Sequence, residues 1–138
     1  MICITMATRR LESAASLPAL LDAAYGAFEE ILSAICGYED SGGEFFAALA
    51  FAAATAADGR DAVAFAPSLP ARLTAPGESA CCCHSPADFT GLAALSATLA
   101  TRLAQAAGAS DNAGDRAACQ DAARLARQLH VLLAGNGP

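Results

Sequence analysis

Apolar side chains recur every third or fourth residue along four long segments of the chain, a spacing that places them on one face of an α-helix. The stripes run over Leu17–Tyr38, Phe89–Leu103 and Ala118–Leu132, and a further segment that begins at Phe45 consists almost entirely of alanine and phenylalanine. None of these segments shows the period-two alternation of a β-strand. The pattern therefore predicts an all-α protein.

Residues that favour helix ends mark the limits of these helices. Ser16 is suited to cap the first helix, the pair Ser41 and Glu44 has the spacing of a capping box before the second, and Ser85-Pro86 has the form of an N-cap and first-turn proline before the third. Gly59 leaves two alternatives for the second helix. It either ends near Gly59 and is followed by a further short turn, or it continues to Ala66.

The spacing of these segments predicts the architecture. Residues 67–85 contain prolines and three consecutive cysteines, so we expect a long irregular connection there. Residues 1–14 precede the first stripe and are expected to form a flexible arm. The remaining four helices, each of about 20 residues, predict one domain over residues 1–138. We expect an antiparallel four-helix bundle with the irregular connection between its second and third helices.

Composition changes the expected core. Alanine accounts for 38 of the 138 residues, and all eight of the basic residues are arginine. Small side chains let helices approach closely, so the few large apolar residues should mark the contacts between helices. The excess of alanine and arginine is also typical of GC-rich bacterial genomes.

Several functional classes are excluded or disfavoured by what the chain lacks. Without lysine it can have neither a Walker A phosphate loop nor a Schiff-base lysine. The last two helices contain no glutamate, which excludes a carboxylate-bridged di-iron centre. The net charge of −6 disfavours nucleic-acid binding, and no uncharged run is long enough to cross a membrane. Consecutive cysteines, with others inside helical patterns, favour a reduced cytoplasmic setting.

One short cluster has the chemistry of a metal site. Cys81, Cys83 and His84 carry thiol and imidazole groups that bind Zn²⁺ or Cu(I), and the first two could converge on one ion. A structural zinc site needs four ligands, and no second cysteine pair at a suitable spacing completes the set. The favoured interpretation is a loop without a cofactor, and zinc or copper binding is the alternative.

Acidic residues are concentrated in the first two helices. Residues 11–70 hold nine acids and a single arginine. The acids from the middle of the first helix to the start of the second, with no base between them, are Glu29, Glu30, Glu39, Asp40 and Glu44. They predict an electronegative surface near the first turn of the bundle, which either docks a basic protein partner or is a solvated end.

The second helix is apolar on every side, which a four-helix bundle alone does not bury. On a helical wheel Phe51 projects away from the arc that holds Phe45, Phe46 and Leu49. Either the irregular connection covers this back face or a second copy of the chain packs on it. We expect a homodimer whose interface comprises Phe51, Ala47, Ala54 and Thr55, because twofold dimers are the commonest oligomers.

These features favour a non-enzymatic helical bundle that acts through protein contacts and self-associates. The alternative is a bundle that binds a small molecule or a metal, in a cavity between alanine-lined helices or in the Cys81–His84 loop.

Overall fold

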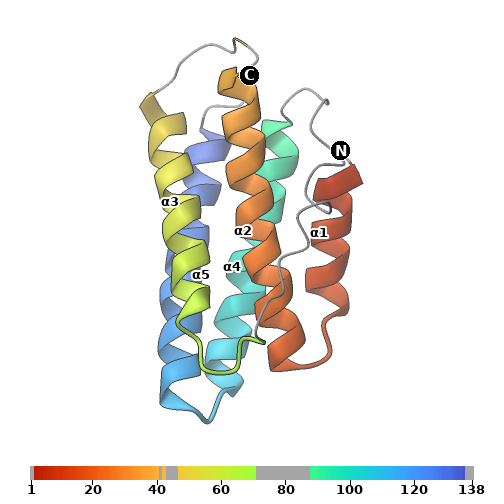
Figure 1. The fold of residues 1–138 in the computed structure, drawn as a ribbon, viewed down its shortest axis with the longest axis vertical. Coiled ribbons are helices and arrows are strands. Elements are labelled where there is room, and N and C mark those ends of the chain that lie inside the picture. Colours follow the sequence, from red (N-terminus) through yellow and green to blue (C-terminus); the bar gives the residue numbers. More distant parts are fainter. Residues whose placement is uncertain (1, 41, 43–46, 71–87, 136–138) are drawn as a thin grey trace.

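The computed structural model describes residues 2–40, 42, 47–70 and 88–135, and every regular element in that part of the chain is an α-helix (Figure 1). The all-α prediction is thus confirmed. The five helices are α1 (Ile2–Ser13), α2 (Leu17–Asp40), α3 (Ala47–Ala64), α4 (Phe89–Ala109) and α5 (Ala113–Ala134).

The helices lie side by side with their axes roughly aligned (Figure 1). α3 packs on both α2 and α5, α4 packs on α5, and α1 packs on both α2 and α4 at the edge of the bundle. Each helix except α4 runs opposite to the one that precedes it in the chain, whereas α3 and α4 run in the same direction (Figure 1). The end of α3 and the start of α4 therefore lie at opposite ends of the molecule, an arrangement that a bundle of strictly alternating helices does not have.

Residues 2–13, which we expected to belong to a flexible arm, instead form α1. The Leu11 side chain of this helix is completely buried, and Ile4 and Ala7 pack against the same core. Arg102 of α4 donates hydrogen bonds to the carbonyl oxygens of Leu11 (3.0 Å) and Ala14 (2.8 Å). These bonds satisfy carbonyl groups that the end of a helix leaves free, so they hold α1 in its place beside α4.

Side-chain caps define the starts of the helices, and the cap of α4 differs from the predicted one. Ser16 accepts a hydrogen bond from the backbone of Ala19 at the start of α2, as the sequence predicts. The N-cap of α4 is Asp88, which accepts from the backbone N–H of Gly91 (2.9 Å), rather than Ser85. Asp is as good an N-cap as Ser, and the first turn of α4 begins directly after Asp88, at Phe89. The proposed capping box at Ser41 and Glu44 lies outside the described residues.

α3 continues through Gly59, which decides between the two alternatives for this helix. Gly59 is buried against Phe28 of α2, the largest completely buried side chain of the described core. A Cβ atom at residue 59 would lie 2.6 Å from Cζ and 2.7 Å from Cδ1 of the Phe28 ring. The glycine is therefore needed for close packing of α2 on α3 and not for a turn.

This contact predicts opposite effects for two matched substitutions. Gly59→Ala should lower the free energy of unfolding by about 1–2 kcal/mol, because overpacking against the buried ring outweighs the gain in helix propensity. Gly26→Ala, in a part of α2 where an added Cβ meets nothing within 4 Å, should raise it by about 0.5–1 kcal/mol. Urea denaturation of both variants provides the comparison. Phe28→Leu should lower the free energy of unfolding by less in the Gly59→Ala variant than in the wild-type chain, because the smaller side chain relieves the overpacking. Additive effects of the two substitutions would contradict this packing.

A buried carboxylate joins the segment after α3 to the start of α5. Asp115 is 2% exposed and accepts hydrogen bonds from Ser68, from its backbone N–H (2.9 Å) and its hydroxyl (2.6 Å). Asp115 also lies in the first turn of α5, where the helix dipole favours a negative charge. The bond pair thereby ties two parts of the chain that are 47 residues apart.

We expect Asp115→Ala to lower the free energy of unfolding by about 2–4 kcal/mol, since it removes two charge-assisted hydrogen bonds and leaves the Ser68 donors without their acceptor. Asp111→Ala is the control, because it removes the same charge from an exposed side chain at the neighbouring turn. Its effect should stay within about 0.5 kcal/mol. Equal effects of the two substitutions in thermal denaturation would refute the structural role of Asp115.

Candidate functional site

The outer face of α3 carries two large aromatic side chains in contact with solvent. Phe51 is 65% exposed, and Phe65, immediately after the helix, is 83% exposed. They are 14 residues apart, which places them on the same side of α3 about 21 Å from each other. Of the other residues in the expected interface, Ala47 and Ala54 are exposed and Thr55 is partly exposed, with its hydroxyl bonded to the carbonyl oxygen of Phe51 (2.7 Å). Their role in a dimer stays a prediction.

Phe65 was missed by the sequence analysis. The sequence could have indicated it by its spacing from Phe51, since 14 residues correspond to nearly four whole turns and place both rings on one face. That spacing has a meaning only if the helix continues past Gly59. Between the two aromatic rings the same face carries Asp58 and Asp61, both exposed, and Arg60 lies 3.4 Å from the Asp61 carboxylate. The face is therefore apolar at both ends and acidic in its middle.

Of the five acidic residues expected to form one surface, the four that the structure describes lie in two separate pairs. Glu39 and Asp40 lie exposed at the end of α2, whereas Glu29 and Glu30 are partly buried in the middle of that helix. Ten residues along a helix separate the two pairs by about 15 Å. Glu44 lies outside the described residues, so a docking surface for a basic partner at the end of α2 stays a prediction.

Partial burial raises the pKa of Glu30 above its ordinary value of 4.5. The folded chain therefore binds this proton more tightly than the unfolded chain does. The contribution to stability is present at pH values below 4.5 and is lost as the pH rises through the higher folded pKa.

Glu30→Gln should consequently raise the melting temperature at pH 7, where the wild-type carboxylate is charged, and change it little near about pH 3, where both chain states carry the protonated acid. Glu29→Gln removes the same charge one residue away and serves as the control. A Glu30→Gln effect that is the same at both pH values would contradict the burial argument.

The predicted metal ligands Cys81, Cys83 and His84 lie outside the described residues, so zinc or copper binding there stays a prediction. In the described ranges no group of three or more His, Cys, Asp or Glu side chains could hold a metal ion. Burial and then the charge of Asp115 raise the pKa of the Cys119 thiol. Partial desolvation, followed by the charges of Glu39 and Asp40, does the same for the exposed Cys36. Both shifts favour the thiol over the reactive thiolate.

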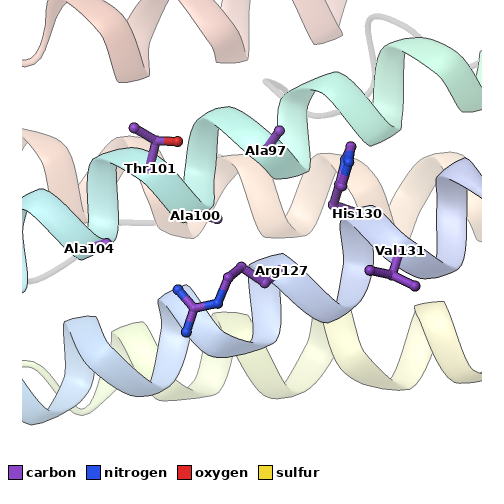
Figure 2. Close-up of a pocket in the computed structure, with 7 residues that line it drawn as sticks. All are labelled: Ala97, Ala100, Thr101, Ala104, Arg127, His130 and Val131. Carbon is purple, nitrogen blue, oxygen red and sulfur yellow. The ribbon is translucent and has the colours of Figure 1, made fainter.

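A groove of about 470 Å³ runs between α4 and α5 (Figure 2). Alanine side chains and Thr101 of α4 line one side, and Arg127, His130 and Val131 of α5 line the other. His130 reaches from α5 toward α4, and its Nδ1 lies 3.0 Å from the carbonyl oxygen of Ala93 (Figure 2). A carbonyl oxygen only accepts hydrogen bonds, so Nδ1 carries a proton and Nε2 remains for another partner.

A second groove, of about 410 Å³, lies where the link between α1 and α2 approaches the link between α4 and α5. Arg102 lines it, but two of the guanidinium nitrogens of this arginine already bind the end of α1. This groove is therefore part of the attachment of α1.

None of the helices in the described ranges is long and apolar enough to span a membrane. Searches against protein-family models, curated proteins and solved structures found no match to this sequence or fold.

Proposed function

We propose that this protein is a non-enzymatic helical bundle that acts through protein contacts and forms a twofold homodimer through the outer face of α3. The observation that supports it is the 65% exposure of Phe51 on a helix whose neighbouring surface is alanine. Covering an exposed phenylalanine removes a large apolar area from water, and two rings that meet across a twofold axis gain further from aromatic packing.

The position of the axis follows from charge. An axis at Asp58, midway between Phe51 and Phe65, would pair these two rings but would also set Asp58 against the same residue of the partner. Two exposed carboxylates that face each other repel, which disfavours this register. An axis at Phe51 places the ring against its own copy and leaves Asp58 and Asp61 away from the centre.

The small residues around Phe51 suit this second register. An antiparallel pair of α3 helices with its axis at Phe51 brings Ala47 opposite Thr55 and Ala54 opposite Ala48. These short side chains let the two helices approach closely enough for the Phe51 rings to meet. The proposed interface thus consists of a central aromatic pair with small residues on both sides, and its polar limit lies at Asp58.

Two matched substitutions test both the dimer and its register. Phe51→Glu should convert the dimer to a monomer, with a dimer dissociation constant raised by about 100-fold or more, because two carboxylates would replace the central ring pair. Phe65→Glu changes the same residue type on the same face but lies outside the proposed contact, so it should leave the dimer intact. Light scattering coupled to size exclusion measures both, and circular dichroism checks that the variants stay folded.

The outcomes separate the alternatives. A wild-type chain that is monomeric at about 100 µM, well above the dissociation constants of specific dimers, would refute self-association. A dimer that persists in Phe51→Glu would refute this interface. Dissociation by Phe65→Glu as well would move the axis to Asp58, and Asp58→Asn should then strengthen the dimer.

A further inference from the structure

The outer face of α4 is unusual for a helix at the surface of a bundle. Helices in such positions carry charged residues on the side away from the core. On α4 the exposed residues are Thr90, Ala94, Thr101, Ala104, Gln105, Gly108 and Ala109, and none of them is charged. The one charged residue of the helix, Arg102, is bound to the end of α1. The groove between α4 and α5 therefore has an uncharged wall of small side chains.

The other side of the groove supplies a cation that forms no ion pair within the described part of the chain. Of the three arginines on α5, Arg116 donates to the carbonyl oxygen of Ser110 and Arg124 pairs with Asp121. Arg127 makes no hydrogen bond or ion pair with any other described residue. Its guanidinium extends along α5 on the side of the groove where Ala104 lies (Figure 2). In a chain with a net charge of −6, this cation stands next to an apolar surface.

The dimensions of the groove limit what it can hold. Its lining on α4 extends from Ala97 to Ala104, two positions that are seven residues and about 10 Å of helix apart. Its volume of about 470 Å³ is in the range of small-molecule sites, and it is open to solvent along its length. A straight apolar chain could lie on the alanine methyl groups with Val131 beside it, while its end group meets the guanidinium of Arg127.

From these features we infer that the groove between α4 and α5 binds an unbranched medium-chain carboxylate. The apolar chain lies along Ala97, Ala100 and Ala104, and Arg127 holds the carboxylate by charge-assisted hydrogen bonds. The inference does not depend on the α3 dimer, because none of the lining residues belongs to α3.

Octanoate is the probe that tests this inference, and amide chemical shifts of the full chain provide the measurement. We expect octanoate to shift residues 97–104 and 127–131 in a saturable manner. Octyltrimethylammonium has the same tail with a positive head group, and butyrate has the same head group with a short tail, so both should bind at least about fivefold more weakly.

Matched variants locate the site. Arg127→Gln should weaken octanoate binding by about fivefold or more, whereas Arg124→Gln, one turn closer to the start of the same helix, should not change it. Ala104→Leu fills the groove and should abolish binding, whereas Ala94→Leu adds the same volume at an exposed position outside it. Unchanged circular dichroism in all four variants shows that they remain folded.

Three results would overturn the inference. The first is the absence of saturable shifts in the groove, and the second is binding of octyltrimethylammonium as tight as that of octanoate. The third is a shift of the groove residues that depends on protein concentration alone, which would make a second copy of the chain the occupant of the groove. Octanoate binding by the Phe51→Glu monomer would support the site independently of the dimer. Failure of one proposal therefore leaves the other intact.

Discussion

The structure depends on a core in which alanine supplies 14 of the 30 buried apolar residues of the described chain. Alanine buries little apolar surface for each residue, so helices that share such a core must lie close together before enough area is removed from water. Close helices leave little room for large side chains, and each of these needs a neighbour that is smaller still. Phe28 shows this directly, because its ring occupies the place where Gly59 lacks a side chain. This contact favours the relative rotation of α2 and α3 in which Gly59 faces the Phe28 ring.

That rotation also determines which residues α3 presents to solvent. Gly59 must face α2, and Phe51, eight residues earlier, then lies about 80° further around the helix. Leu49, Ala52 and Ala56 complete the buried side. The direction in which α3 presents its aromatic side chains is thus set by a contact inside the core.

The features that could be predicted from the sequence are those that depend on neighbouring residues. The stripe of α2 and its cap at Ser16 are local patterns, and the structure contains both. α1 was missed because its stripe is short and its end is held by Arg102, which lies 91 residues from Leu11 in the chain. The continuity of α3 could not be decided for the same reason, since the role of Gly59 appears only once Phe28 lies beside it.

The candidate sites also divide into features that depend on neighbouring residues and features that depend on residues far apart in the chain. The outward direction of Phe51 could be derived from the helical wheel of α3 alone. The groove could not, because it requires the register of two helices, in which His130 meets the backbone of Ala93 across 37 residues of sequence. The five acids were grouped by their order in the chain, but the length of α2 separates Glu30 from Glu39.

The shared direction of α3 and α4 has a consequence for how the chain folds. Only three residues join α4 to α5, so these two helices can pair as a local hairpin at a small cost in loop-closure entropy. α3 is separated from α4 by 24 residues, so its packing on α5 must close a much longer loop. The hydrogen bond between Ser68 and Asp115 likewise joins residues that are 47 positions apart. We therefore expect the hairpin to form first and to serve as the template on which the aromatic face of α3 is finally oriented.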